Sequence, residues 1–439
     1  MQKLLDINGK LCSCGKIHSF SSQVVSGKGV LCRLPELAEN FHASRIFLLS
    51  DPNTYQVAGA QVFDLLTARG FTVVSCCLPW ESPEPDEASV GSALMHFDNR
   101  CDLVIGVGSG VINDIGKLVS AAAHLPYIIV ATAPSMDGYA SATSSMTRSG
   151  LKISLNTKAA DVILGDTEIL RTAPLTMMKA GLGDMLAKYV SICEWRISQR
   201  ITGEYYCEEI ADLIRSALKR CIDNADALLN QEEDAVQAVF EGLVIGGVAM
   251  NYAGLSRPAS GVEHYISHIL DMRAVEFGTP AHPHGIQCAV GTMEALKLYE
   301  ALTALTPDRD TALAYAAAFD SAAWEENLRA LLGKGAEAMI TLEKREKKYD
   351  AASHRCRLET ILANWQEILD IIAQELPSVQ ALSNLLTRMD MPQGIEALGI
   401  PRAQFPEIFR ATKDIRDKYV LSRLAWDLGV LDRMIETAK

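Results

Sequence analysis

The stretch DLVIGVGSGVIND, residues 102–114, joins an apolar run to a glycine-rich turn and the start of a helical pattern. The run is apolar throughout, which is typical of a parallel strand covered on both faces. Gly106, Gly108 and Gly110 would let the backbone approach a pyrophosphate, whose oxygens would meet the N–H groups at the start of the helix. Because Asn113 stands where the G-x-G-x-x-G pattern has its third glycine, the loop alone indicates a dinucleotide site only weakly.

Similar apolar runs precede and follow this stretch, and helical patterns separate them. The alternation predicts a doubly wound α/β domain that binds ligands at the carboxyl ends of its parallel strands. The other strands are expected at RIFLLSD (45–51), FTVVSCCL (71–78) and YIIVATA (127–133), with helices near 54–69, 87–99 and 111–123.

The second part of the chain has a different texture. From about residue 168, Ala, Leu, Glu and Met recur at helical spacing, and breaks rich in Pro and Gly separate the segments. We therefore predict two domains, an α/β nucleotide-binding domain over residues 1–167 and an all-helical domain over residues 168–439. The charged segment LEKREKKYD (342–350) is expected to be a solvated helix face or loop rather than a binding site.

The composition excludes several classes of partner. The chain has 41 basic and 54 acidic residues, a net charge of −13, so no overall positive field attracts nucleic acid or anionic lipid. The first residues, MQKLLDINGK, lack the apolar core of a signal peptide, and no run of about 20 uncharged apolar residues is present. We therefore expect a soluble cytoplasmic protein, with no nucleic-acid or membrane partner, whose 11 cysteines are reduced thiols.

Histidines gather in one part of the predicted helical domain. Of the nine in the chain, His264, His268, His282 and His284 fall within 21 consecutive residues. On a helix, His264 and His268 share one face, and the Pro and Gly beside His284 suit a tight helix entry. The grouping favours a metal site over four separate core or surface roles, but such a site needs at least one more ligand.

Two aspartates allow both a functional and a structural interpretation. Asp184, in GLGDMLAKY (181–189), is a candidate third ligand, but an acid near a helix start is equally explained by the helix dipole. Spacing alone does not join it to histidines 80 residues away. Asp51, after a predicted strand, could bind an adenosine ribose and repel a 2′-phosphate, or could simply begin the turn DPN (51–53).

Five segments carry a resemblance to a known superfamily. They are GVGSGVINDIGK (106–117), ATAPSMDGYASATS (131–144), GLGDMLAKY (181–189), SRPASGVEHYISH (256–268) and HPHG (282–285). Together and in order they resemble the iron-containing alcohol dehydrogenases, glycerol dehydrogenases and dehydroquinate synthases, and most closely the bacterial AraM-type sn-glycerol-1-phosphate dehydrogenases. The resemblance implies a dehydroquinate synthase-like fold, in which a Rossmann-like α/β domain precedes an all-helical one.

Position by position, the resemblance makes Asp184, His264 and His284 the metal ligands, with zinc, nickel or iron as the ion. Iron-type alcohol dehydrogenases often have a further histidine ligand where this chain has Lys188, so a three-ligand site is implied. Dehydroquinate synthases use glutamate as their first ligand, and the aspartate here therefore indicates the dehydrogenase branch.

The resemblance also assigns a cofactor, NAD(H) or NADP(H), to the α/β domain. Asp137 matches an acid of the glycerol dehydrogenase substrate cleft, although a simple turn residue in MDGY is the alternative. Where the family has three consecutive glycines, this loop has a serine, whose N–H and hydroxyl both suit a phosphate. The implied cofactor residues are Asp51 at the ribose, Gly108, Ser109 and Gly110 at the pyrophosphate, Thr132, Ser135 and Ser141 toward the nicotinamide, and in addition Asp114.

The implied reaction is the reversible reduction of dihydroxyacetone phosphate to sn-glycerol 1-phosphate by NAD(P)H, with the metal polarising the carbonyl. His268 is the candidate proton relay, since imidazole titrates near neutral pH and this one lies one turn from a ligand. Arg257, or else Lys152, could hold the substrate phosphate, although a surface ion pair is the simpler explanation of each.

Two rival functions stay open: a glycerol dehydrogenase acting on an unphosphorylated polyol, and a catalytically silent protein that kept the fold. The resemblance suggests a homodimer or larger assembly. The segment CSCGKIH (12–18) has two cysteines and a histidine close together, but a second metal site would need a fourth ligand that the sequence does not identify. A structural strand is therefore the preferred interpretation of this segment.

Overall fold

The computed structural model describes residues 7–149 and 151–437, and the chain forms two compact units. Unit 1 holds the residues up to Met185 together with Asp212–Gly254. Unit 2 holds Leu186–Ala211 and the residues from Leu255 onward. The predicted boundary after residue 167 follows the last strand, whereas each compact unit is built from two separate stretches of the chain.

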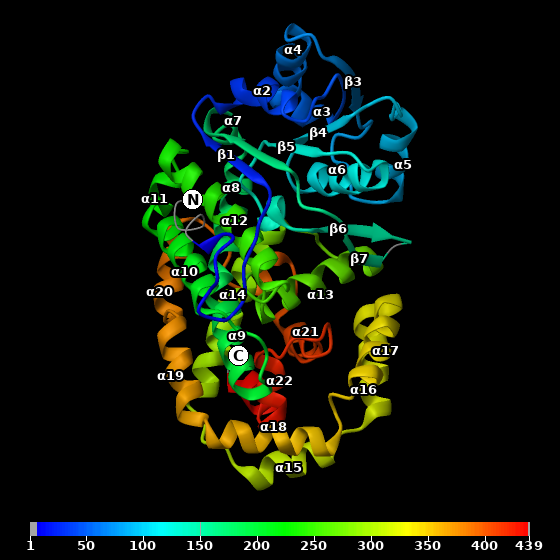
Figure 1. Cartoon of the computed structure of the whole chain (residues 1–439). Helices are drawn as coiled ribbons and strands as arrows, with labels where there is room; N and C mark the ends of the chain where they lie inside the picture. The colour runs from blue at the N-terminus through cyan, green and yellow to red at the C-terminus, as the bar shows by residue number, and fades with distance from the viewer. Residues whose placement is uncertain (1–6, 150, 438–439) are drawn as a thin grey trace. The chain divides into compact units, whose positions relative to one another are not determined.

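Unit 1 is organised around a six-stranded parallel sheet with the strand order β1-β8-β5-β4-β2-β3 (Figure 1). The predicted α/β class is therefore confirmed. The strands are β1 (Gln23–Gly27), β2 (Arg45–Ser50), β3 (Thr72–Cys77), β4 (Leu103–Gly108), β5 (Tyr127–Ala131) and β8 (Val162–Asp166). The helices are η1 (Val30–Arg33), α2 (Leu34–Glu39), α3 (Pro52–Thr54), η2 (Tyr55–Gly59), α4 (Ala60–Ala68), α5 (Glu87–His96), α6 (Gly110–Ala123), η3 (Asp137–Ala140), α7 (Thr167–Leu170), α8 (Leu175–Leu186), α11 (Ala225–Leu228) and α12 (Glu233–Ala253).

Helices cover both faces of this sheet. Ile46 and Leu48 of β2 belong to an apolar core shared with α2 and α4. Phe47 points to the opposite face, where its ring packs edge-on against Phe97 at the end of α5, with the centroids 5.1 Å apart. Successive side chains of one strand are thus buried on opposite faces, which explains the uninterrupted apolar runs.

The path of the chain creates a topological switch point beside β2. From β2 the chain runs outward to β3 and then returns to β4, which pairs with β2 on its other side. In open α/β sheets, a ligand crevice forms at the carboxyl ends of two such strands. Asp51 follows β2 and Ser109 follows β4, so both lie at this crevice.

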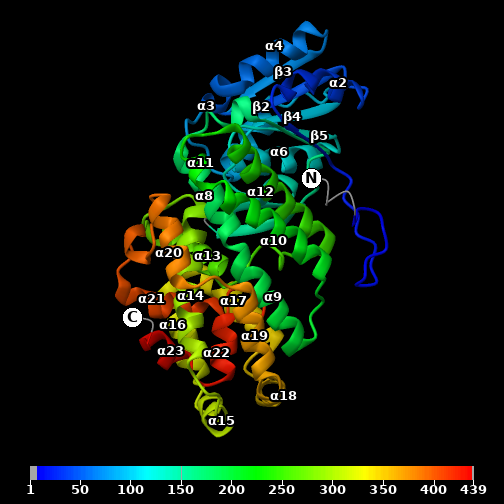
Figure 2. The same cartoon turned by 90° about the vertical axis from the view of Figure 1, so that its left-hand side faces the viewer.

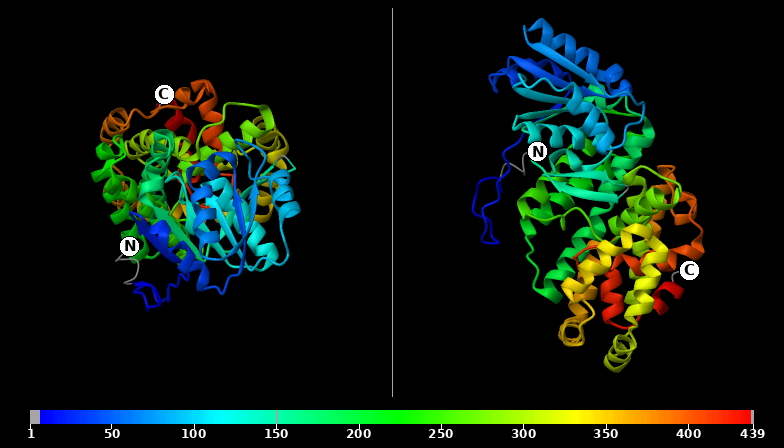
Figure 3. Two further views of the ribbon diagram at one scale, coloured as in Figure 1. Left: turned by 90° about the horizontal axis from the view of Figure 1, so that it is seen from above. Right: turned by 90° about the vertical axis from the view of Figure 1, so that its right-hand side faces the viewer.

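A separate antiparallel hairpin consists of β6 (Thr143–Arg148) and β7 (Leu151–Asn156) and is not part of the parallel sheet (Figure 3). In β6, Ser144 and Met146 are buried, whereas Thr143 and Ser145 are exposed. These strands are polar and alternate in burial, so they lack the apolar run that marks the other strands.

The long apolar helix α12 is a core element of unit 1 (Figure 2). Among the described residues it is the one helix long and apolar enough to cross a membrane, but 83% of that apolar window is buried inside the protein. Close packing explains the burial. A Cβ at Gly165 of β8 would lie 2.1 Å from the Phe240 ring, and a Cβ at Gly247 would lie 2.8 Å from the Cβ of Ala140 in η3.

The described part of unit 2 is helical, as predicted for the second half of the chain. One apolar core joins its helices, and α19 lies beside α9, where Arg196 pairs with Glu375 (Figures 1 and 2). The cysteines that the structure describes are thiols, none of them in a disulfide. The helices are α9 (Lys188–Thr202), α13 (Val262–Phe277), α14 (His284–Thr303), α15 (Arg309–Ala317), α16 (Ser321–Leu332), η4 (Gly333–Gly335), α17 (Ala336–Glu346), α18 (Ala351–Ala363), α19 (Trp365–Glu375), α20 (Val379–Arg388), η5 (Ile395–Leu398), η6 (Arg402–Gln404), α21 (Phe405–Thr412), α22 (Leu421–Asp427) and α23 (Leu431–Thr437), while α10 (Glu208–Asp223) begins in unit 2 and continues into unit 1.

Candidate functional site

The turn between β4 and α6 is the predicted phosphate-binding loop. Gly108 ends β4, Ser109 precedes the helix, and Gly110 begins α6. A Cβ at Gly108 would lie 2.5 Å from the Cβ of Ile112, so glycine is what lets the strand pass this close to the helix. The first-turn N–H groups of α6 therefore open onto the carboxyl edge of the sheet, where the helix dipole favours an anion.

Gly106 has a different role from the predicted one. A Cβ at Gly106 would lie 2.5 Å from the hydroxyl oxygen of Tyr127, and a Cβ at Gly116 of α6 would lie 2.4 Å from the same oxygen. These two glycines make room for the buried Tyr127 side chain. The expectation that Gly106 lets the backbone approach a pyrophosphate is therefore corrected to a role in packing α6 on the sheet.

Hydroxyl groups from the end of β5 lie beside this loop. The Oγ atoms of Ser109 and Ser135 are 2.6 Å apart, and the Thr132 N–H donates to the Gly108 carbonyl over 3.1 Å. This arrangement follows from the sheet, because β5 pairs directly with β4. Thr132 and Ser135, predicted from sequence to lie toward the nicotinamide, are thus next to the predicted pyrophosphate loop.

Asp114 and Ser141 have contacts that involve the β6–β7 hairpin. Asp114 Oδ1 lies 2.8 Å from Lys117 Nζ, and that ammonium also donates to the carbonyls of Gly138 and Thr143. Burial raises the pKa of Asp114, while the charge of Lys117 opposes the rise. Ser141 Oγ lies 2.9 Å from Thr143 Oγ1 at the start of β6. These contacts hold the hairpin on α6, and cofactor contact by Asp114 and Ser141 stays a prediction.

Asp51 caps a helix at the end of β2. Its Oδ1 accepts a hydrogen bond from the Thr54 N–H over 2.9 Å, and Thr54 Oγ1 accepts one from the Asp51 N–H over 3.0 Å. This reciprocal pair of hydrogen bonds is a capping box. The alternative that Asp51 begins the turn at 51–53 is therefore correct for its Oδ1 atom. The ribose role of Asp51 stays a prediction that its position at the switch point favours.

Asp184 is fully buried in α8 of unit 1. Its Oδ2 accepts a hydrogen bond from the Asp137 N–H over 2.9 Å, so the η3 turn orients the carboxylate. Gly181, one turn earlier, brings the helix close to the segment after β5, since a Cβ there would lie 1.9 Å from the Pro134 carbonyl oxygen. Asp137 begins the η3 turn and contacts the predicted ligand through its backbone N–H, while a role of its side chain in the substrate cleft stays a prediction.

Three of the four clustered histidines of unit 2 come together. His264 and His268 lie on α13, and His284 begins α14. The ring centroids of His264 and His284 are 5.1 Å apart, and that of His268 lies 6.4 Å from His264 and 6.3 Å from His284. His282 is turned to another partner, with its Nε2 3.0 Å from the Leu398 carbonyl oxygen.

Hydrogen bonds fix which nitrogen each of the two closest rings presents. His264 Nδ1 lies 2.8 Å from the buried carboxylate oxygen Oε1 of Glu263, so Nδ1–H is the donor there and Nε2 carries the lone pair. The Ser267 hydroxyl donates to Gln287 Oε1 over 2.9 Å, and therefore accepts from His284 Nδ1 over 3.1 Å. Both rings thus present Nε2, with the outer partners that metal-ligating histidines have, and this donor pair fits a divalent ion.

A cysteine that the sequence did not single out lies at the same place. Cys288, one turn after His284 on α14, is buried, and its Sγ lies 3.5 Å from His284 Nε2. Burial raises the pKa of this thiol, but His264 and His284 outweigh that effect and lower it. The i, i+4 spacing of His284 and Cys288 repeats that of His264 and His268, and it was the signal that could have found this residue.

Lys188 does not replace the additional histidine ligand of related enzymes. Its side chain is buried, and Nζ donates to the Ala259 carbonyl over 3.0 Å. An ammonium has no lone pair for a metal. The grouping of Asp184 with the two histidines of unit 2 stays a prediction from the resemblance.

The two candidates for the substrate phosphate differ sharply. Arg257 is fully buried, and its three nitrogens bond to Glu204, to the Tyr419 carbonyl and to Ser198 Oγ. It therefore forms an ion pair, the alternative allowed by the sequence, although inside unit 2 rather than at the surface. Lys152 lies on β7 of the hairpin with an exposed side chain.

Comparison with known proteins finds similarity to one family of dehydrogenases. The model of the iron-containing alcohol dehydrogenase family matches residues 25–174. The enzyme named glycerol-1-phosphate dehydrogenase (NAD(P)+) from Halalkalibacterium halodurans is 32% identical over 294 residues, which are 66% of this chain and 74% of that protein. The enzyme of the same name from Methanosarcina mazei is 36% identical over 282 residues, 63% of this chain and 76% of that one.

Solved structures share the fold at lower identity. Glycerol dehydrogenase from Schizosaccharomyces pombe has a TM-score of 0.61 at 18% identity, covering 96% of this chain and 92% of that chain. Sulfoacetaldehyde reductase from Bifidobacterium kashiwanohense, solved in complex with NAD+, has a TM-score of 0.61 at 16% identity, covering 95% and 97%. At these identities the likeness shows the fold alone.

Proposed function

The chain belongs to the glycerol-1-phosphate dehydrogenase family, and on that premise we propose that it catalyses the reversible reduction of dihydroxyacetone phosphate to sn-glycerol 1-phosphate by NAD(P)H. It is an oxidoreductase that uses NAD(P) and a divalent metal. The observation that carries the proposal is the sequence identity to relatives of this name over most of their length.

The dinucleotide is proposed to bind at the carboxyl edge of the sheet in unit 1. Gly108, Ser109 and Gly110 would hold the pyrophosphate at the start of α6, where N–H groups and the helix dipole favour it. Asp51 at the end of β2 would bind the ribose. The other proposed cofactor residues, for which the sequence resemblance is the support, are Asp114, Thr132, Ser135 and Ser141.

The metal ligands are proposed to be Asp184, His264 and His284. The two histidines are supported by their bonded Nδ1 atoms, which leave Nε2 for an ion. Asp184 is supported by its residue type, its complete burial and the resemblance. Zinc, nickel and iron all accept such mixed oxygen and nitrogen donors. When bound, the ion would supply Lewis-acid polarisation of the substrate carbonyl.

His268 is proposed to give the proton that the product hydroxyl requires. Its ring is half-buried beside the two proposed ligand rings, so it can reach both the substrate and solvent. Asp137 is proposed to line the substrate cleft. For the substrate phosphate we favour Lys152 over Arg257, because the Arg257 nitrogens are already engaged inside unit 2.

Initial rates with a panel of substrates test this function. The metal-loaded protein should oxidise NADH or NADPH with dihydroxyacetone phosphate, and should reduce NAD(P)+ faster with sn-glycerol 1-phosphate than with sn-glycerol 3-phosphate or glycerol. A faster rate with glycerol would show that the protein is a glycerol dehydrogenase instead. Absence of turnover with every member of the panel would indicate a catalytically silent nucleotide-binding protein. Metal analysis of the same preparation identifies the ion.

We propose a cytoplasmic homodimer or larger homo-oligomer whose partner is its small-molecule substrate, without nucleic-acid or membrane partners. The net charge of −13 and the burial of α12 support the last point. Light scattering of the purified protein after size-exclusion chromatography would measure the assembly directly.

A further inference from the structure

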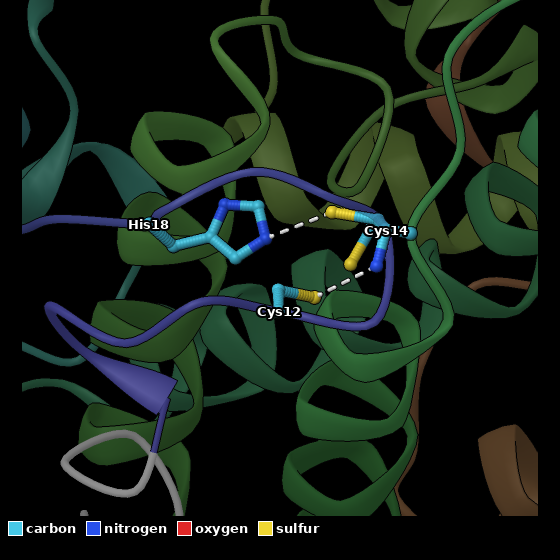
Figure 4. A group of neighbouring side chains, drawn as sticks. Cys12, Cys14 and His18 are labelled. Carbon is cyan, nitrogen blue, oxygen red and sulfur yellow. Dashed lines mark hydrogen bonds between the residues drawn. The ribbon is translucent and has the colours of Figure 1, made fainter.

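The segment CSCGKIH near the N-terminus forms a tight hairpin whose chemistry the proposed reaction does not use. Leu11 and Ile17 form an antiparallel bridge, and the Cys12 N–H donates to the Lys16 carbonyl over 2.9 Å. The turn needs Gly15, whose φ of +83° suits glycine, and its N–H donates to the Cys12 carbonyl over 2.9 Å. This backbone brings the side chains of Cys12, Cys14 and His18 to one place (Figure 4).

The spacing of these three side chains is that of ligands on one ion. Cys14 Sγ lies 3.4 Å from His18 Nε2, and the ligand atoms of Cys12, Cys14 and His18 all lie within 4.8 Å of one another. In a tetrahedral zinc site, bond lengths of about 2.3 Å to sulfur and about 2.0 Å to nitrogen put sulfur and nitrogen about 3.5 Å apart, and two sulfurs about 3.8 Å apart. The observed sulfur–nitrogen distance therefore agrees with shared coordination.

The orientation of His18 supports the same conclusion. The side chain is buried, and Nδ1 lies 3.0 Å from the carbonyl oxygen of Tyr252 in α12. A carbonyl can only accept, so Nδ1 carries the proton and the lone pair is on Nε2, the atom that faces Cys14. A backbone carbonyl bonded to the distal nitrogen is the usual outer partner of a metal-ligating histidine.

The apolar residues of the hairpin do not anchor it. Leu11 is 73% exposed and Ile17 is 66% exposed, so the largest apolar side chains of the segment point to solvent. What the segment buries instead is Cys12 and His18. A segment with so little apolar burial is the kind that metals stabilise in small folds, where the binding free energy of the ion becomes folding free energy.

We propose that Cys12, Cys14 and His18 of unit 1 bind a structural zinc ion. Thiolate and imidazole are the donors that zinc takes in structural sites, and sulfur donors select zinc over the ions that prefer oxygen.

Metal content of single variants tests the proposal with the full-length protein. After loading with zinc and removal of excess ion, the wild-type protein should hold two equivalents per chain. Cys14→Ser and His18→Gln should each hold one, while His284→Ala should lose the other equivalent and keep this one. Cys32→Ser, which changes an exposed cysteine of unit 1, is the matched control and should keep both.

Cobalt gives a second readout that does not depend on catalysis. Cobalt bound by thiolates absorbs in the near ultraviolet, and the band should survive in His284→Ala and disappear in the His284→Ala, Cys14→Ser double variant. A single equivalent in the wild-type protein, or two equivalents in Cys14→Ser, would overturn the site. Since Cys14 is partly exposed in a loop, its replacement should leave the global fold and the turnover intact.

Discussion

The Nδ1 atom of His264 lies 2.8 Å from Oε1 of Glu263, and both side chains are buried. A buried carboxylate in this position fixes the tautomer of the ring and makes Nε2 a stronger donor to a metal. We expect Glu263→Gln to lower the affinity for the catalytic metal about 10- to 100-fold, measured by competition with a chelating dye.

Ser267→Ala is the matched comparison, because Ser267 holds His284 as Glu263 holds His264, but without a charge. Its effect on metal affinity should be smaller. If Glu263→Gln binds metal as tightly as the wild-type protein, the carboxylate has no part in preparing the ligand.

His268→Ala should lower kcat about 10²- to 10⁴-fold while metal content stays unchanged, because a proton donor is lost and the proposed ligands stay in place. Initial rates and metal analysis of one preparation measure both quantities. His282→Ala is the control, since its ring contacts the Leu398 carbonyl instead of the other histidines. Wild-type turnover in His268→Ala would refute the proton relay.

Asp51→Asn should raise the preference for NADPH over NADH, measured as the ratio of the two kcat/KM values. Asparagine caps helices as well as aspartate does, so the variant keeps the bond to the Thr54 N–H while it removes the negative charge. Asp51→Ala, which also loses the cap, should in addition be less stable by about 1 kcal/mol. An unchanged preference in Asp51→Asn would exclude contact with the ribose.

The strands that the sequence predicted are those with uninterrupted apolar runs. The run at 45–51 became β2 (Arg45–Ser50), and the run at 127–133 became β5 (Tyr127–Ala131), because burial on both faces leaves a signal in every residue. The β6–β7 hairpin has no such signal. Its strands are held by partners distant in sequence, such as Lys117 of α6, which local patterns do not report.

The candidate site was predictable to a similar, partial degree. Histidine spacing indicated the cluster, because helical periodicity puts His264 and His268 on one face. The outer partners could not be predicted, since Glu263 and Ser267 become meaningful only once the ring nitrogens have positions. The glycine loop shows the same limit: the sequence assigned Gly106 to a phosphate, whereas its role depends on a tyrosine from the neighbouring strand.

The stability of the protein should fall as pH rises toward 8, because of Glu194. Burial and the nearby Glu263 raise the pKa of this carboxyl from 4.5 to about 8, although it accepts hydrogen bonds from the N–H groups of Val262 and Leu421. Between these values the folded state holds a proton that the unfolded state has lost. The free energy of unfolding should therefore decrease by up to about 1.4 kcal/mol per pH unit across this window.

Urea denaturation at a series of pH values and at fixed metal concentration measures this slope. Glu194→Gln should be less stable at pH 6, since an amide N–H group must then face a backbone N–H, but it should lack the contribution of Glu194 to the slope. A slope that is identical in the two proteins would assign the pH dependence to other groups.

Gly108→Ala should both weaken NADH binding and lower the free energy of unfolding, because its Cβ would lie 2.5 Å from the Cβ of Ile112. Forcing a methyl group into such a contact costs about 1–3 kcal/mol, and relief of the contact must move the start of α6 away from the strand.

Gly91→Ala in α5 is the matched control, since a Cβ there would have no neighbour within 4 Å, and it should be neutral or stabilising by up to about 1 kcal/mol. Urea denaturation and fluorescence titration with NADH measure the two effects. If Gly108→Ala lowers stability and binds NADH normally, the close approach serves packing only and the pyrophosphate lies elsewhere; if neither quantity changes, α6 can shift freely and the close-contact argument fails.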